Sequence, residues 1–545
     1  MSAVSKHDDG EPGSQDAPTR ARVKLTLVLP AGGIPNWLLD LMLALRDTDF
    51  IDLSLVALER VESARPSVSR PFERWKRFEN RLIRTRSEHR DTESSAGPVE
   101  RVGHRHELAI VQANAQDLEQ RLMTGKPDVV VWLSAEPPPR ALTGGIRYGI
   151  WTLENALSRG TGHTELVEGQ PATCSRLLRY GRDPAGDETL AVAATATDIQ
   201  SLSRGLSTVR SKDQTLLMTM LRRVAVLREA ALAPCGAAER PAAGVDEPGW
   251  LGLAVDIARV YARYLRDVLS RALYLEQWQI AYRIGPGRLP DAAMGRLAPA
   301  HRGFWADPFV VAWQGRTFIF FEELPQDEPK GRIAAVEVFD DGRTGRPVIV
   351  LEKAFHLSYP FLLEHEGSLF MVPEAADSNR IEAYRCERFP DLWVPHAVLL
   401  EGVRAFDPTL FEHDGRWWMF VTMDAAGNTC NDELHLFYGA TPFGPWVSHP
   451  MNPVNLDVRS ARPAGQVFEE DGQLIRPAQD CSVRYGYAIR LQRIVELTCS
   501  TYREETAGCI EPGWARHSLG THTANHAAGL TVYDCNIRRF KYGSF

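Results

Sequence analysis

Two aspartates, each followed by proline, stand at equivalent points of an internal repeat in the C-terminal half of the chain. Asp307-Pro308 and Asp407-Pro408 each precede a short apolar run, a turn with glycine and a second apolar run. Carboxylates gathered in one pocket can act as bases, nucleophiles or acids, which is the chemistry that makes and breaks glycosidic bonds. Asp-Pro also commonly starts a turn, but two of them at equivalent points of a repeat favour pocket residues.

The other copies of the repeat place different polar residues at the same point. Tyr359 starts the second copy, Arg462 the fourth and His522 the weaker fifth. We expect these side chains to meet the two aspartates and to bind substrate. Arg462 could bind a carboxylate, a phosphate or a sugar hydroxyl, or could pair with Asp307 or Asp407 as a structural ion pair, and the sequence leaves both interpretations open.

A general acid is the next group that such a pocket needs. Glu374, in Pro373-Glu374-Ala375, is our candidate, although it could also be a solvated strand end. Glu322 and Glu323 hold the related place in the first copy and compete with it. Trp305, just before the first aspartate, could stack on a sugar ring as a substrate-binding residue.

A metal site and a bound cofactor are not expected. His522 and His526 have the spacing of a metal-binding pair on a helix, but they fall among strands, and His522 stays only a minor candidate for an ion ligand. Gly32-Gly33 follows the first strand without a G-x-G-x-x-G pattern, so we expect a tight turn and no phosphate site.

The repeat predicts the elements that position these residues. Copies recur about every 50 residues, which is typical of propeller blades. Each blade exposes an apolar face that its neighbours bury around the ring. The first residue of each copy sits where the innermost strand starts, at one mouth of the central channel. We therefore expect an all-β five-bladed propeller.

The N-terminal half has a different pattern. Val23–Leu29 is a short apolar run, a helical pattern follows over Trp37–Leu45, and Asp128–Leu133 is a fully apolar strand of the buried parallel type. Strands alternating with helices predict an α/β domain with a parallel sheet. In a chain of 545 residues two domains are expected, and the predicted divisions are a disordered tail (1–20), the α/β domain (21–232), a linker and helix (233–273) and the propeller (274–545).

Composition narrows the class of protein. The net charge of -8 gives no basic footprint, so we expect no nucleic-acid partner. No apolar run approaches the roughly 20 residues of a transmembrane helix, and the polar N-terminus has no apolar signal segment, so we expect a cytoplasmic protein. The eight cysteines include no C-x-x-C pair. Reduced thiols are the simpler expectation, with a few disulfides after residue 380 as the alternative.

The Asp-Pro starts resemble those of the five-bladed arabinanase, xylosidase, invertase and levansucrase families. That resemblance implies that Asp307 is the base or nucleophile and that Asp407 orients substrate or stabilises the transition state. The acid of those families comes from another blade, and Glu374 is the loosest match because their usual acid motifs are absent here.

Four further strings resemble the N-terminal region of glucosamine inositolphosphorylceramide transferases. They are His356-Leu357-Ser358-Tyr359-Pro360, Asp407-Pro408-Thr409, Thr441-Pro442-Phe443-Gly444-Pro445-Trp446 and Arg476-Pro477-Ala478-Gln479-Asp480-Cys481-Ser482. The last string contains Asp480, which we expect to bind substrate. In those transferases a separate glycosyltransferase domain lies downstream, and this chain, which stops at Phe545, is not expected to contain it. The resemblance implies sugar handling.

The N-terminal domain resembles a formyltransferase. Tyr148-Gly149-Ile150-Trp151, Glu168-Gly169-Gln170-Pro171 and Asp183-Pro184-Ala185-Gly186-Asp187 follow the order of that fold's core segment. Trp151 and Leu153 stand where the family has its catalytic Asn and His. We therefore expect a formyltransferase-like scaffold that has lost that chemistry.

These observations favour a carbohydrate-active enzyme that transfers a glycosyl unit in glycolipid or polysaccharide assembly. The substrate is then a sugar or glycoconjugate, with a nucleotide sugar as a candidate donor. Two alternatives stay open: a glycoside hydrolase of the five-bladed type, and a non-catalytic sugar-binding module that recruits a partner enzyme. An acid within reach of Asp307 would favour an enzyme, and carboxylates neutralised by Arg462 would favour a binding module.

Overall fold

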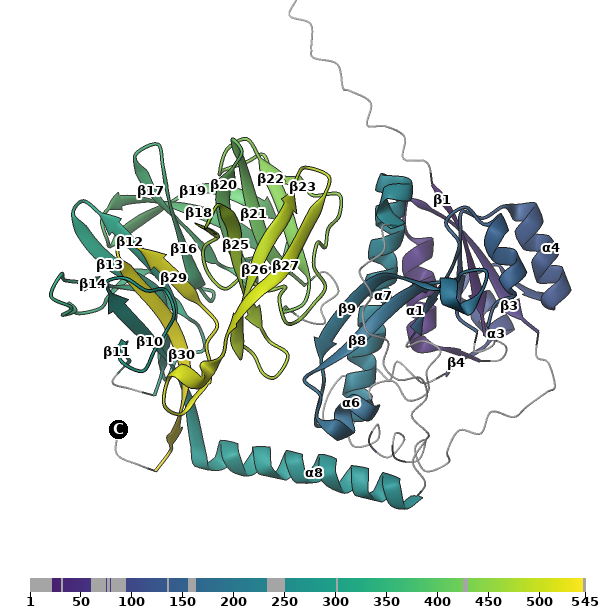
Figure 1. Ribbon diagram of the computed structural model, residues 1–545, viewed down its shortest axis with the longest axis horizontal. Helices are drawn as coiled ribbons and strands as arrows, with labels where there is room; N and C mark the ends of the chain where they lie inside the picture. Colours follow the sequence, from purple (N-terminus) through teal and green to yellow (C-terminus); the bar gives the residue numbers. More distant parts are fainter. Residues whose placement is uncertain are drawn as a thin grey trace, which may run out of the picture.

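The computed structural model has an N-terminal α/β part and a C-terminal β-propeller, joined by the long helix α8 (Figure 1). The residues that it describes are 22–30, 33–59, 75, 79, 95–134, 137–154, 163–232, 250–299, 302–424 and 430–542. The expected tail at 1–20 and most of the expected linker lie outside the described residues.

The N-terminal part is built on one seven-stranded sheet with the order β5-β3-β1-β6-β7-β8-β9. The first five strands in this order are parallel, which confirms the predicted mostly parallel sheet. β8 runs antiparallel to β7, and β9 runs antiparallel to β8, with which it forms a hairpin. The strands are β1 (Val23–Leu29), β3 (Ile51–Leu58), β5 (Ile110–Ala113), β6 (Val129–Trp132), β7 (Ile150–Leu153), β8 (Ala172–Arg179) and β9 (Glu188–Ala196).

Helices flank this sheet and a two-stranded ribbon lies beside it. The helices are α1 (Asn36–Arg46), α3 (Val99–His106), α4 (Ala115–Gly125), α6 (His163–Glu168) and α7 (Leu202–Leu227), and the ribbon strands are β2 (Gly33–Pro35) and β4 (Ser95–Pro98). Trp151 and Leu153 are fully buried in the sheet. The likeness to formyltransferases stays a prediction.

The C-terminal part is an all-β propeller of five blades, as the repeat predicts. Four of the blades are consecutive four-stranded antiparallel sheets. Their strands are β12 (Phe304–Trp313), β13 (Arg316–Leu324), β14 (Arg332–Val338) and β15 (Val348–Leu351); β16 (Ser358–His365), β17 (Ser368–Glu374), β18 (Arg380–Arg388) and β19 (Leu392–Glu401); β20 (Ala405–His413), β21 (Arg416–Met423), β22 (Leu434–Gly439) and β23 (Val447–Ser448); and β24 (Phe468–Glu470), β25 (Gln473–Asp480), β26 (Ala488–Leu497) and β27 (Tyr502–Ile510).

The fifth blade closes the ring with strands from both ends of the propeller sequence. β30 (Leu530–Phe540) pairs on one side with β28 (Ser518–Gly520) and β29 (Ala524–Ala527) and on the other with β10 (Tyr274–Ile284), which in turn pairs with β11 (Gly295–Leu297). The first strand of the propeller is thereby hydrogen-bonded to the last, and no edge strand is left open at the seam.

The first hairpin of every blade has the same two-residue turn. In each, a non-glycine residue with φ near 50° precedes a glycine with φ near 70°. Both positions lie in the left-handed region, where glycine is least strained, and this turn matches the twist of the flanking strands. The five turns are Gln314-Gly315, Glu366-Gly367, Asp414-Gly415, Asp471-Gly472 and Ala528-Gly529.

The α/β part and the propeller are held together by a buried ion pair. Lys212 of α7 places its Nζ 2.9 Å from Oδ1 of Asp432 and 2.9 Å from Oε1 of Glu433, and all three side chains are buried. The backbone of β9 also bonds to the propeller, since the Val458 amide donates to the Ala194 carbonyl over 3.0 Å.

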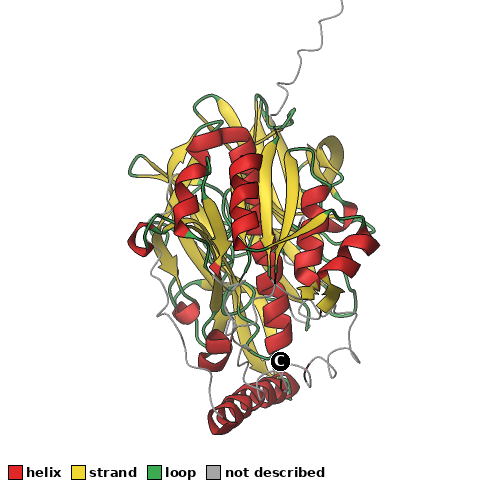
Figure 2. Ribbon diagram, turned by 90° about the vertical axis from the view of Figure 1, so that its right-hand side faces the viewer, coloured by secondary structure: helices red, strands yellow, loops and turns green. Residues whose placement is uncertain are grey.

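The helix α8 (Trp250–Leu273) runs along one edge of the molecule and leads directly into β10 (Figures 1 and 2). It confirms the helix expected after the linker. Of the described helices, none is long and apolar enough to span a membrane. The seven cysteines within the described ranges are free thiols.

Candidate active site

In each of the first three blades, the backbone turns one side chain out of the regular strand pattern. Asp307, Tyr359 and Asp407 have φ values of 53°, 43° and 53°, although each lies in an innermost strand. Proline follows each of them and cannot donate to the neighbouring strand, and the strand register shifts there. Non-glycine residues in this conformation are strained and cluster at functional sites. The repeat therefore presents three polar side chains at one end of the channel.

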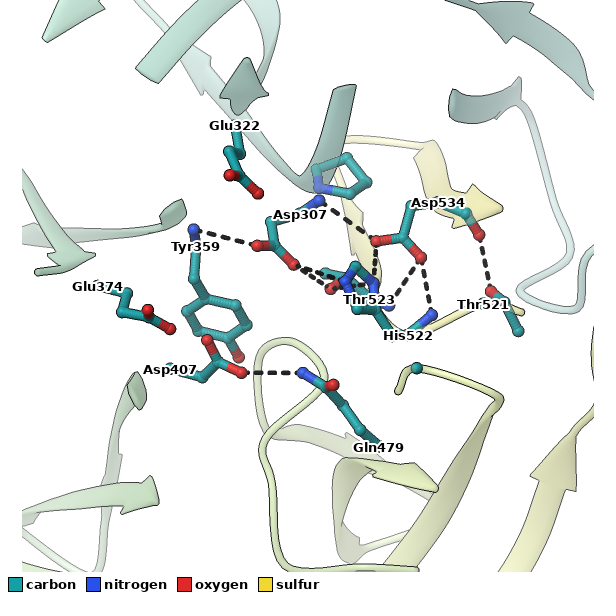
Figure 3. Close-up of polar contacts among 12 residues, drawn as sticks. Asp307, Glu322, Tyr359, Glu374, Asp407, Gln479, Thr521, His522, Thr523 and Asp534 are labelled. Carbon is teal, nitrogen blue, oxygen red and sulfur yellow. Dashed lines mark hydrogen bonds and ion pairs between the residues drawn. The ribbon is translucent and has the colours of Figure 1, made fainter. Parts of the chain in front are cut away.

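Asp307 is buried at the junction between the first blade and its two neighbours (Figure 3). Its Oδ1 accepts a hydrogen bond from the Thr523 hydroxyl at 2.7 Å, and its Oδ2 accepts one from the Tyr359 amide at 3.3 Å. Nε2 of His522 lies 3.7 Å from Oδ1. Blades one, two and five thus all contribute to the environment of this carboxylate.

His522 connects Asp307 to a second buried aspartate, Asp534 of β30. Nδ1 of His522 forms a close contact with Oδ2 of Asp534, whose Oδ1 also accepts the backbone amides of His522 and Thr523 at 2.8 and 3.0 Å. The imidazole stacks on Trp278 with 4.1 Å between the ring centroids. This packing fixes the ring in one orientation between the two carboxylates.

Asp407 and Glu374 are held by one arginine. Nε of Arg462 lies 2.6 Å from Oδ2 of Asp407, and its terminal NH2 lies 3.3 Å from Oδ1 of Asp407 and 3.2 Å from Oε2 of Glu374. Gln479 also donates to Oδ2 of Asp407 at 2.8 Å. Of the two roles considered for Arg462, the structure shows an ion pair, and its partners are Asp407 and Glu374.

Glu322 provides a buried carboxyl group that no arginine of the described residues contacts by a hydrogen bond. It lies in β13 beside Asp307, and its carboxyl group points toward that residue in Figure 3. Nε2 of His356 lies 3.3 Å from its Oε1. Glu323, the adjacent residue, instead accepts from the Trp305 indole at 3.2 Å and from Arg332 at 2.9 Å.

Burial dominates the electrostatics of this cluster. It raises the pKa of Asp307 to about 6, and the nearby His522 only partly offsets the effect. Burial, followed by the charges of Asp307 and Asp407, raises the pKa of Glu322 well above its usual value. Burial and Asp407 likewise raise the pKa of Glu374, against the opposing influence of Arg462. Carboxyl groups with such shifts can keep a proton near neutral pH, as a general acid must.

Asp307, His522 and Asp534 also offer three possible metal-ligand atoms within 4.8 Å of one another. Two carboxylates and an imidazole are a suitable donor set for a divalent ion. In the described structure Nδ1 of His522 already contacts Asp534, and its Nε2 lies 3.7 Å from Asp307.

The structure brings most of the sequence-predicted residues together, with two exceptions. Asp307, Tyr359, Glu374, Asp407, Arg462 and His522 contact one another directly or through one shared partner. Trp305 packs against Phe321, 4.9 Å between centroids, and is 9% exposed, so its ring is part of the blade core. Asp480 binds Ser482 and Arg490 rather than the cluster.

The sequence-based candidates lacked several residues of the cluster. Among these are Thr523, which follows His522, Gln479, which lies in β25, and Asp534, which lies in β30. Gln479 is part of a string already noted for its resemblance to the transferases. Asp534 interrupts the apolar run Leu530–Tyr533, and that interruption is the one signal that could have drawn attention to it.

The propeller is similar in sequence to known proteins. Residues 293–519 match the family described as glucosamine inositolphosphorylceramide transferase 1, N-terminal. This confirms the resemblance drawn from the four strings. Over 205 residues the chain is 36% identical to glucosamine inositolphosphorylceramide transferase 1 of Oryza sativa subsp. japonica and 35% identical to that of Arabidopsis thaliana. The match covers 37% of this chain and 27% of each relative, about a quarter of the relatives' length.

Solved structures with some likeness include glycoside hydrolases. A family 117 glycoside hydrolase of Zobellia galactanivorans is 12% identical, with a TM-score of 0.32 over 47% of this chain and 90% of its own. A GH43 β-xylosidase/α-arabinofuranosidase from a compost metagenome is 13% identical, with a TM-score of 0.33 over 48% of this chain and 94% of its own.

Proposed function

We propose that the protein transfers a glycosyl unit in glycolipid assembly and that the reaction takes place at the buried carboxylates of the propeller channel. The observation that carries this proposal is the cluster itself, in which carboxyl groups with raised pKa values meet from different blades. The similarity of residues 293–519 to proteins named as glucosamine inositolphosphorylceramide transferases supports a glycolipid acceptor. A nucleotide sugar is then the natural donor.

The contacts suggest a role for each carboxyl group. Asp307, which accepts hydrogen bonds from Thr523 and the Tyr359 amide, is the base or nucleophile. Glu322 is a better acid than Glu374, because burial favours its protonated form and, within the described part of the chain, no arginine is bonded to it as Arg462 is to Glu374. Asp407, fixed by Arg462, orients the substrate or stabilises the positive charge that develops on the sugar.

A non-catalytic sugar-binding module is the second candidate, and one observation favours it. Arg462 binds both Asp407 and Glu374, which neutralises part of the negative charge at the channel. A neutralised, rigid cluster is better suited to the recognition of sugar hydroxyls than to acid–base chemistry. Hydrolysis remains the alternative within the enzyme class, since water in place of a lipid acceptor would use the same carboxylates.

The test is turnover by variants of the two proposed catalytic residues. The wild type is incubated with nucleotide sugars and an inositolphosphorylceramide acceptor, and the products are identified by mass spectrometry. Asp307→Asn removes the base or nucleophile and Glu322→Gln the acid, so each should lower kcat by at least about 100-fold. Free sugar formed without acceptor would indicate hydrolysis.

Glu323→Gln is the matched control, because Glu323 is the adjacent buried glutamate but contacts Trp305 and Arg332. It should retain most of the wild-type kcat. Full turnover by folded Asp307→Asn would rule out the proposed site. Sugar binding of equal affinity in all variants, with turnover in none including the wild type, would establish the binding module instead.

A further inference from the structure

The outward face of α8 is apolar along its whole length. Leu251, Val255, Ala258, Ala262, Leu265 and Leu269 recur at alternating spacings of four and three residues, so they line one side of the helix. Within the described structure these side chains contact no other part of the chain extensively, since Leu251 is 85% exposed, Leu265 58% and Leu269 53%. The opposite side, with Leu253 and Val260, is buried against Trp75 and Leu166.

The apolar sector is wide and has a basic border. With Tyr261, Val268 and Leu273 it spans roughly 140° of the helix circumference, broader than a coiled-coil seam. Arg259 and Arg266 follow it on one side, and both are exposed. The acidic residues of α8 are Asp256 and Asp267, and both lie on the side that faces the protein. The outward surface is therefore apolar and positively charged.

Aromatic side chains extend this surface beyond the end of the helix. Tyr274 and Phe540 pack with 5.8 Å between centroids, and Tyr542 packs on Phe540 at 5.7 Å. Tyr542 is 75% exposed. The Lys541 amide donates to the Leu273 carbonyl at 2.9 Å, which ties this segment to the C-terminus of α8.

From these observations we propose that the outward face of α8 and the Tyr274, Phe540 and Tyr542 side chains dock on a lipid bilayer that carries anionic lipids. A helix with a wide apolar sector, arginines at its border and aromatic residues at its end lies in the plane of such an interface. The arginines complement the negative surface of the bilayer. A second copy of this chain fits less well, because paired α8 helices would bring Arg259 and Arg266 near their own counterparts, and Asp256, which lies 3.5 Å from Arg259, belongs to the same helix and is on the side that faces the protein.

Docking through this surface would place the channel mouth near the bilayer. α8 continues without a loop into β10, whose Trp278 stacks on His522 of the candidate site. The C-terminal end of the apolar surface and the carboxylate cluster therefore both adjoin β10. A lipid acceptor would then reach the cluster from the membrane. The docking surface itself stands independently of the proposed function, because it can be tested without turnover.

The experiment measures sedimentation of the full chain with vesicles of phosphatidylcholine alone or mixed with phosphatidylglycerol. The wild type should bind the mixed vesicles more tightly, and added salt should weaken this binding. Leu265→Glu with Leu269→Glu should lower the partition coefficient about 100-fold, since each leucine contributes about tenfold. Arg259→Glu with Arg266→Glu should abolish the preference for the anionic vesicles.

The control variant is Leu392→Glu with Val398→Glu, which changes two similarly exposed apolar residues of β19, 43% and 48% exposed. It should bind vesicles like the wild type, and all variants should keep the wild-type melting temperature. Equal vesicle binding by the α8 variant and the control would overturn the proposal. A second result would also overturn it: the wild type is a dimer and does not bind vesicles, and Leu265→Glu with Leu269→Glu converts the dimer to a monomer. In that case α8 would pair with a second copy of the chain.

Discussion

The surroundings of Asp307 affect the pKa of its carboxyl group in two opposite directions. Burial and the charges of Asp407 and Asp534 favour the protonated carboxyl group, whereas His522 and the hydrogen bond from Thr523 favour the ionised one. Burial prevails and the pKa rises to about 6, while Asp534 and Asp307 outweigh burial at His522 and raise its pKa. A carboxyl group that changes charge near neutral pH is suited to acid–base chemistry.

This shift predicts how stability depends on pH. The folded-state pKa of Asp307 exceeds the usual value near 4, so between pH ~4 and ~6 the folded protein binds more protons than the unfolded chain. The contribution of Asp307 to the free energy of unfolding therefore falls as pH rises through that window. Asp307→Asn should remove about 3 kcal/mol of this pH dependence. Chemical denaturation of both proteins across the window measures it. Identical pH profiles would contradict the prediction, because they would mean that Asp307 has the same pKa in the folded protein as in the unfolded chain.

At the scale of elements, the repeat made part of the site predictable. Asp307 and Asp407 share one place in their blades, so the sequence alone indicated that they would meet. Asp534 could not be predicted in this way, because it lies in the second strand of its blade and resembles any polar residue of a strand. Likewise β10 carries no copy of the repeat, so nothing in the pattern marked it as the partner of β30.

Substitution of two glycines with positive φ distinguishes the cost of backbone strain from the cost of a steric clash. Gly465 has φ +132°, and a Cβ there would lie 2.1 Å from the Ala524 carbonyl oxygen, whereas Gly415 has φ +67° and nothing within 4 Å of its Cβ position. Gly465→Ala should therefore lower the free energy of unfolding by about 3 kcal/mol or more. Gly415→Ala should cost only about 1–2 kcal/mol, from strain alone. Denaturation curves of the two variants test this, and equal losses would show that the Ala524 contact relaxes.

At the scale of the whole molecule, one lysine connects the two folded parts. Burial lowers the pKa of Lys212, but Asp432 and Glu433 more than compensate and keep it charged. The arrangement satisfies three buried charges at once, so each depends on the others. Sequence analysis could not find this contact, because nothing in either domain alone indicates which surface meets the other.

Lys212→Met should therefore lower the free energy of unfolding by about 3–5 kcal/mol, since it removes the lysine that pairs with both buried carboxylates. Arg316→Met removes an exposed pair with Glu337, the arginine side chain being 46% exposed, and should cost at most about 1 kcal/mol. Denaturant titration of both variants makes the comparison. A loss for Lys212→Met no larger than that of the control would show that the two parts are held together by other contacts.

The seam between β10 and β30 also has a consequence for biosynthesis. Tyr274 pairs with Phe540, so the strand that opens the propeller leaves the ribosome long before the strand that completes it. Until then the backbone groups of β10 that will pair with β30 have no partner within the ring and remain a template for other chains. Closure of the ring joins residues far apart in the sequence, which slows folding. Until β30 has been synthesised, the nascent propeller therefore keeps an unpaired β10 edge that other chains can bind.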